Sequence, residues 1–94
     1  MYIIKELRKT CPACPSQWEG KLDNGKMIYI RYRWSCLSVS VSEKPTNDIM
    51  DAVNGRTIYE KYIGDELGFD GYLEDDEMFF VLKDILKKEN KKRR

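Results

Sequence analysis

Apolar and polar residues alternate twice within residues 17–42, and this alternation limits the fold of the chain more than any other feature of the sequence. Every second residue of 28–34 is large and apolar, and the same period returns in 37–41, where serines occupy the alternate positions. A period of two indicates a β-strand that buries one face and exposes the other. The segment therefore predicts an antiparallel β-meander with one buried side.

The length of the first turn decides which face of the sheet Trp18 occupies. A two-residue Asn-Gly turn would point Trp18 away from the apolar face and leave a tryptophan in solvent. A three-residue loop at 23–25, closed by Gly25 in the left-handed conformation, pairs Trp18 with Ile30 on the apolar face instead. We therefore predict the three-residue loop.

The second turn is expected at Ser35-Cys36, where two residues connect the strands and pair Trp34 with Leu37. No glycine is present there to supply a positive φ. This register keeps the large apolar side chains on one side of the sheet. The predicted buried face consists of Trp18, Ile28, Ile30, Tyr32, Trp34, Leu37, Val39 and Val41.

Periodic segments also lie on both sides of the meander. The β-branched segment 2–7 predicts a strand, and residues 49–53, which precede an Asn-Gly pair, predict a short helix. Residues 56–63 alternate well enough for a strand, which we favour over a helix, and the glycine-rich stretch 64–71 predicts a loop. In 73–90 the apolar residues follow helical spacing, with carboxylates in the first turn and lysines at the end, as the helix dipole favours.

Together these elements predict a single small α+β domain over residues 1–94. Its expected architecture is an antiparallel β-meander sheet of roughly three to five strands, packed on one face by the C-terminal α-helix. A flexible basic tail is expected at about 88–94. The sequence shows no internal repeat and no second domain.

Composition excludes several classes of protein. No apolar run approaches the roughly 18 residues of a bilayer-spanning helix, and no signal peptide is expected because Met1 precedes a strand-like segment. Three cysteines, an odd number, agree with a reducing cytoplasm. The chain has 17 basic and 16 acidic residues, a net charge of +1, and so lacks the basic field of a dedicated nucleic-acid binder. Histidine is absent and no catalytic motif is present, so we expect neither an enzyme nor a cofactor.

Cys11 and Cys14 form the most chemically suggestive motif, a Cys-x-x-Cys spacing. Such a pair supplies two of the four ligands of a zinc site, and Cys36 is a candidate third ligand if its turn folds back toward this loop. No histidine or fourth cysteine completes the set. The spacing also resembles the Cys-Pro-x-Cys motif of thioredoxin-like proteins, but Pro15 and a hairpin follow where that family has a helix. We favour structural or free thiols and expect no metal.

Residues 66–77 resemble the twelve-residue calcium loop of the EF-hand. Asp70 and Gly71 match its fifth and sixth positions, and Leu73 and Glu77 match its eighth and twelfth. The resemblance implies calcium ligands at Asp70 and Glu77. The first and third positions depart from the pattern, because they are glutamate and glycine. We therefore prefer a glycine turn followed by the acidic start of a helix.

The sheet face opposite the predicted core carries Tyr29, Arg31 and Arg33, with Glu19 beside Tyr29. Cations and rings interleaved on exposed strands are typical of single-strand RNA-binding surfaces, so nucleic-acid binding through this face and the basic tail is one alternative. A zinc- or calcium-binding domain is another. The near-neutral charge favours a non-catalytic protein–protein interaction module, a small inhibitor or accessory factor of the kind that phages and other mobile elements encode. The predicted surface, for a protein partner and not for a membrane, consists of Tyr29, Arg31, Arg33, Asp70, Glu74 and Glu77.

Overall fold

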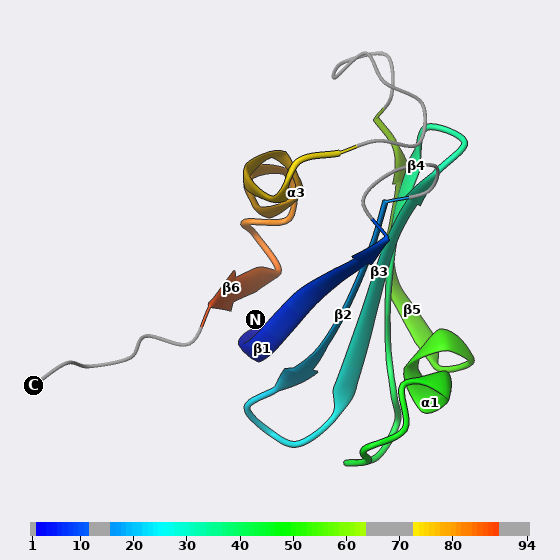
Figure 1. The fold of residues 1–94 in the computed structure, drawn as a ribbon, viewed down its shortest axis with the longest axis vertical. Helices are drawn as coiled ribbons and strands as arrows, with labels where there is room; N and C mark the ends of the chain where they lie inside the picture. Colours follow the sequence, from blue (N-terminus) through cyan, green and yellow to red (C-terminus); the bar gives the residue numbers. More distant parts are fainter. Residues whose placement is uncertain (1, 12–15, 64–72, 89–94) are drawn as a thin grey trace, which may run out of the picture.

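The computed structural model describes residues 2–11, 16–63 and 73–88, which form a six-stranded sheet with two short helices. The strands are β1 (Tyr2–Cys11), β2 (Ser16–Leu22), β3 (Met27–Arg33), β4 (Cys36–Val41), β5 (Arg56–Tyr62) and β6 (Leu86–Lys88), and the helices are α1 (Met50–Val53) and α3 (Asp75–Val81). The order in the sheet is β5-β4-β3-β2-β1-β6, with every neighbouring pair antiparallel except β1 and β6. Figure 1 shows α1 and α3 on opposite sides of this curled sheet.

The β2–β3 hairpin has the predicted register. Trp18 pairs with Ile30, and both side chains are buried. The connecting loop has three residues and closes at Gly25, whose φ is 89° and whose N–H donates to the carbonyl oxygen of Leu22 at 3.0 Å. Glycine adopts a positive φ without steric cost, so the position of this glycine determines the loop length and the register of the hairpin.

The β3–β4 hairpin turns one residue earlier than predicted. Trp34 and Ser35 form the turn, with φ values of 56° and 61°. The expected pairing of Trp34 with Leu37 is wrong, because Leu37 pairs with Tyr32 instead. Two positive φ values match the twist of the flanking strands, and the strands impose this turn although neither residue is glycine or asparagine. Trp34 consequently leaves the predicted buried face and is 70% exposed.

The change in register leaves every other side chain of the hairpin on its predicted face. The pairing shifts by two residues, which is also the side-chain period of a strand. The remaining members of the predicted buried face are all buried. They belong to one core cluster, which consists of Ile4, Trp18, Leu22, Ile28, Ile30, Tyr32, Leu37, Val39, Val41, Ile63, Leu73, Met78, Leu82 and Leu86.

The C-terminal segment is not one long helix. α3 is only seven residues long, and β6 follows it and pairs in parallel with β1. The predicted helix over 73–90 is therefore confirmed only over Asp75–Val81, and the prediction of a strictly antiparallel sheet of three to five strands is wrong, because the sheet has six strands and one parallel pair. The four-residue spacing of Met78, Leu82 and Leu86 predicted one helix. All three side chains are buried, but they come from a helix, a turn and a strand, respectively. β6 also covers an edge of β1 that would otherwise present unpaired backbone groups.

The other predicted elements are present where the structure describes them. α1 lies within the predicted helix 49–53, and β5 confirms a strand within 56–63. The predicted loop 64–71 lies outside the described residues, as do residues 89–94 of the predicted tail. Lys88, the first residue assigned to that tail, belongs to β6.

Gly20 allows β1 to approach β2 closely. The pairing of these strands is interrupted by a bulge between Ile4 and Glu6, and bulges increase the local twist of a sheet. A Cβ atom on Gly20 would overlap the carbonyl oxygen of Glu6. Position 20 therefore accommodates only glycine without a backbone shift.

Hydrogen bonds attach the start of α3 to the core side of the sheet. The indole N–H of Trp18 donates to Asp75 Oδ1 at 2.8 Å, and the Lys9 ammonium donates to the carbonyl oxygen of Leu73 at 2.7 Å. The N–H of Leu73 donates to Ser16 Oγ at 3.0 Å. Lys9 also lies 5.1 Å from the centroid of the Trp18 ring, within the range of a cation–π contact. These contacts hold α3 over the core and leave the opposite face of the sheet to α1 and solvent.

Candidate functional site

The outer face of the sheet, opposite the core, carries the three predicted residues of β3. Tyr29, Arg31 and Arg33 alternate with buried residues, so their side chains share the outer face. Arg33 is exposed, and Tyr29 and Arg31 are half-buried. Gln17 and Ser38 flank Arg31 on the neighbouring strands.

α1 covers one end of the outer face, next to the β2–β3 loop. Figure 1 shows it beside the ends of β4 and β5 that lie farthest from the β3–β4 turn. Ser40, which points to the outer face, is buried, and so is Ala52 of α1. The uncovered part of the outer face is therefore the other end, around Arg31 and Arg33.

Arg33, Trp34 and Tyr62 form an exposed group at the β3–β4 turn, the hairpin-tip cluster. Trp34 is 70% and Tyr62 is 75% exposed, and Arg33 Cζ lies 5.5 Å from the centroid of the Trp34 ring. Cys36 pairs with Arg33 on one side and with Tyr62 on the other, so these side chains form a row across β3, β4 and β5. A hydrogen bond of 2.8 Å from the N–H of Ile63 to a carbonyl oxygen of the turn fixes the end of β5 in this position.

The two arginines of the uncovered end have no carboxylate partner within the part of the chain that the structure describes. Two salt bridges occur there, and neither includes Arg31 or Arg33. Arg8, on β1 at the level of Tyr29, is paired with Glu19 at 3.9 Å. Glu60 lies on β5 at the level of Arg31 on β3, with β4 between them. The spacing of strands places the backbones of these two residues roughly 10 Å apart. The guanidinium groups of Arg31 and Arg33 thus have no described carboxylate within 4 Å.

The thiol of Cys36 lies within this charged surface. Burial raises the pKa of the Cys36 thiol, and the carboxylate of Glu60 raises it further, while Lys61 and Arg31 act in the opposite direction. A raised pKa keeps the thiol protonated at neutral pH, and a protonated thiol is a poor nucleophile and a poor metal ligand.

The structure does not bring the described cysteines together. Cys11 lies on β1 and Cys36 on β4, with β2 and β3 between them, which separates the strands by roughly 14 Å. Both are present as thiols, and Cys14 lies outside the described residues. In residues 2–11, 16–63 and 73–88, no group of three cysteine, aspartate or glutamate side chains is placed to hold a metal ion.

Glu74 and Glu77 take part in the start of α3. Glu74 is the N-cap residue, and its N–H donates to Glu77 Oε1 at 3.0 Å in a reciprocal capping box. This is the acidic helix start that the sequence predicts, since such a box satisfies two N–H groups at a helix terminus. Asp70 lies outside the described residues. Because α3 packs on the core side, the glutamates are not brought together with the arginines of the outer face.

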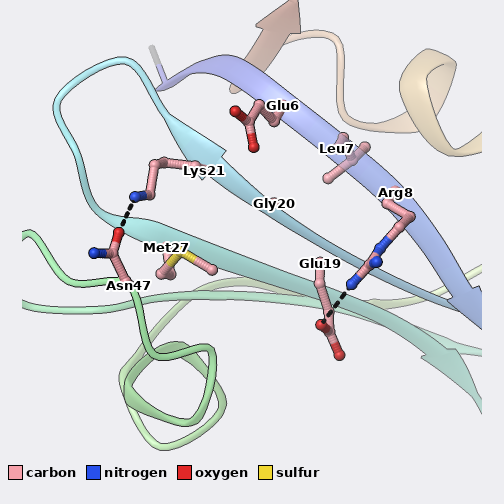
Figure 2. Close-up of a pocket in the computed structure, with 8 residues that line it drawn as sticks. All are labelled: Glu6, Leu7, Arg8, Glu19, Gly20, Lys21, Met27 and Asn47. Carbon is pink, nitrogen blue, oxygen red and sulfur yellow. Dashed lines mark hydrogen bonds and ion pairs between the residues drawn. The ribbon is translucent and has the colours of Figure 1, made fainter.

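A hollow of about 420 Å³ lies on the outer face near α1, as Figure 2 shows. Its lining residues are Glu6, Leu7, Arg8, Glu19, Gly20, Lys21, Met27 and Asn47. Arg8 pairs with Glu19, and Lys21 donates a hydrogen bond to Asn47. Four of its polar side chains are therefore already paired with one another, and the arrangement indicates no particular ligand.

Sequence reasoning misses two members of the hairpin-tip cluster. Tyr62 could have been found, because the period of two in β5 places it on the same face as Glu60. Trp34 could not, because a turn through two positive φ values at Trp-Ser contradicts the residue preferences of such turns.

No protein-family model matches the chain, and comparisons with curated proteins and with solved structures found no match either. Among the residues that the structure describes, no helix has the length and apolar character needed to cross a membrane. The function therefore has to be argued from the site itself.

Proposed function

We propose that this chain is a small, non-catalytic protein–protein interaction module, an inhibitor or accessory factor, whose contact surface is the hairpin-tip cluster together with Tyr29 and Arg31. The observation that carries the proposal is the 70% exposure of Trp34 in a turn with two positive φ values. A side chain in the left-handed conformation costs roughly 1–2 kcal/mol. Strain of this kind clusters at functional positions.

The composition of the cluster supports a protein partner. Tryptophan, tyrosine and arginine are the residues that most often dominate the binding energy of protein interfaces. Arg33 and Tyr62 lie on paired strands and Trp34 lies in the turn between β3 and β4, so the backbone at the cluster is already ordered before a partner binds. The proposed location is a reducing cytoplasm, because Cys36 is a thiol and the chain has an odd number of cysteines.

Nucleic-acid binding is the second candidate, because Arg33 beside Trp34 also suits a stacking surface for single strands. Glu19 and Glu60 lie on the same face, and the net charge is only +1. A phosphate chain carries a negative charge at every nucleotide and would meet these carboxylates. The observations therefore favour a protein.

The test is affinity capture from an extract of the source organism, with the purified chain immobilised and bound proteins quantified by mass spectrometry. Trp34→Ala and Tyr62→Ala are the test variants, and Phe80→Ala is the matched control. Phe80 is 67% exposed but belongs to α3, away from the cluster. A protein enriched by the wild type and by Phe80→Ala, and lost with either test variant, would support the proposal.

The captured protein is then produced in pure form and titrated calorimetrically against the same variants. Loss of a central interface residue costs about 2 kcal/mol or more, so Trp34→Ala should weaken binding by about 30-fold. Equal binding by all variants, or capture of no protein above background, would count against the proposed surface.

A further inference from the structure

We propose that the hairpin-tip cluster and Arg31 bind an acidic, extended segment of the protein partner, with two carboxylates at alternate positions followed by an apolar side chain. The carboxylates pair with Arg31 and Arg33, and the apolar side chain packs against Trp34 and Tyr62. This inference rests on the proposed function and adds the chemistry of the partner.

The ion pairs of the outer face are the reason for proposing that the segment is acidic. Arg8 has an internal partner in Glu19, whereas Arg31 and Arg33 have no carboxylate within 4 Å among the described residues. A guanidinium group binds a carboxylate through two parallel hydrogen bonds, so each unpaired arginine is a ready carboxylate site. Two arginines on one strand face, without a carboxylate partner among the described residues, favour a segment with two carboxylates.

The spacing of the arginines indicates the extended conformation. Arg31 and Arg33 are two residues apart on β3 and share a face, so their backbones are roughly 6.6 Å apart along the strand. An extended partner segment repeats its side chains on one face at the same interval. Carboxylates at alternate positions of such a segment match both arginines at once.

The aromatic residues indicate an apolar side chain next to the carboxylates of the partner. Trp34 comes directly after Arg33 at the turn, and Tyr62 lies on the same row as Arg33 across β4. Both rings are mostly exposed, and the Arg33 guanidinium lies 5.5 Å from the Trp34 ring. An apolar side chain placed there removes aromatic surface from water and strengthens the neighbouring ion pair by excluding solvent.

A phosphate chain fits the same surface less well. Glu60 lies on β5 at the level of Arg31, and Glu19 lies on β2 at the level of Tyr29. The positively charged surface around the two arginines is therefore bordered by a carboxylate within two strands on either side. Two carboxylates need only the two unpaired guanidinium groups. A nucleic-acid strand needs a continuous basic path for its successive phosphates.

The test uses three short synthetic peptides and backbone amide NMR spectra of the full chain. The acidic probe is Asp-Ser-Asp-Ser-Phe, the neutral probe is Asn-Ser-Asn-Ser-Phe and the basic probe is Lys-Ser-Lys-Ser-Phe, each with blocked ends. A single-stranded oligothymidylate is the fourth probe. The protein variants are Arg31→Ala with Arg33→Ala, Arg31→Glu with Arg33→Glu, and Arg8→Ala as the control on the same face.

The acidic probe should shift the amides of residues 31–35 and 60–62 and bind at least tenfold more tightly than the neutral probe. The double alanine variant should lose that preference, the double glutamate variant should transfer it to the basic probe, and Arg8→Ala should keep it. Native-like spectra of the variants show that the fold is intact.

Equal affinity for the acidic and neutral probes would overturn the inference, and so would tighter binding of the oligothymidylate at the same amides. The two proposals fail separately. A partner captured through Trp34 that binds the double glutamate variant as well as the wild type would refute the acidic segment and leave the interaction module standing.

Discussion

Replacing Ser35 with glycine should make the protein more stable, because Ser35 has a φ of 61° in a two-residue turn. A residue with a Cβ atom in this conformation costs roughly 1–2 kcal/mol, which glycine avoids. Glycine also loses more backbone entropy on folding, a cost of roughly 0.5–1 kcal/mol. The difference is a net gain between about 0 and 1.5 kcal/mol, and its midpoint of about 0.75 kcal/mol corresponds to an increase in Tm of about 3–6 °C for a domain of this size.

The measurement is thermal unfolding followed by circular dichroism, with Ser38→Gly as the matched control. Ser38 lies three residues further along the same hairpin, in the extended backbone of β4, where glycine should lower stability by roughly 0.5–1 kcal/mol. The same chemical change should therefore have opposite signs at two positions of one hairpin. A decrease in Tm for Ser35→Gly equal to that for Ser38→Gly would refute the argument that the turn is strained.

Three further predictions concern other parts of the chain. Gly20→Ala should destabilise the protein by about 1–3 kcal/mol in urea titrations, because the added methyl group overlaps a carbonyl oxygen of β1. Trp18→Phe should lower the free energy of unfolding by about 2 kcal/mol in the same assay, because the mutation removes the 2.8 Å hydrogen bond to the Asp75 carboxylate and part of the core. A change within 0.5 kcal/mol would refute the stabilising role of Trp18. Glu60→Gln should lower the pKa of Cys36, because it removes a negative charge that raises this pKa. In a background whose other cysteines are serine, iodoacetamide should then alkylate the Cys36 thiol faster at pH 8. An unchanged rate of alkylation would contradict the coupling between Glu60 and Cys36.

The sheet could be predicted where a local residue determined the geometry. Gly25 has the positive φ that closes a three-residue loop, and the pairing of Trp18 with Ile30 results from that loop. The period of two then assigns the faces of β3 and β4 correctly even where the register is displaced by two residues. Local chemistry and strand periodicity are both readable from sequence, and together they specify half of the core cluster.

The C-terminal segment could not be predicted for the opposite reason. Met78, Leu82 and Leu86 have helical spacing, and isolated propensity favours a continuous helix. The parallel pairing of β6 with β1 depends on a contact between the two ends of the chain, which no local pattern encodes. Tertiary pairing with an open strand edge overrides a propensity of a few tenths of a kcal/mol per residue.

The candidate site could be predicted only in part. The outer-face positions of Tyr29, Arg31 and Arg33 result from the strand period. The glutamates of the predicted surface do not join them, since Glu74 and Glu77 form the capping box of α3 on the core side of the sheet. Acidic residues near the start of a helix stabilise that start. From the sequence alone, a glutamate with this structural role cannot be distinguished from a glutamate that binds a partner.

The two errors of the sequence-based fold differ in what they imply about function. The helix error has a structural explanation, because the residues involved are buried in the core and stabilise the fold. The error at Trp34 has none, because the residue is both strained and exposed, and glycine or asparagine would form the same turn at a lower cost. Positions that break a local rule are expected at functional sites. Trp34 is such a position, and it lies beside the two arginines that have no internal carboxylate partner among the described residues. Strain, exposure and charge that is unpaired among the described residues thus coincide at one end of the outer face, and the proposed partner, which covers Trp34 and supplies carboxylates, would account for all three.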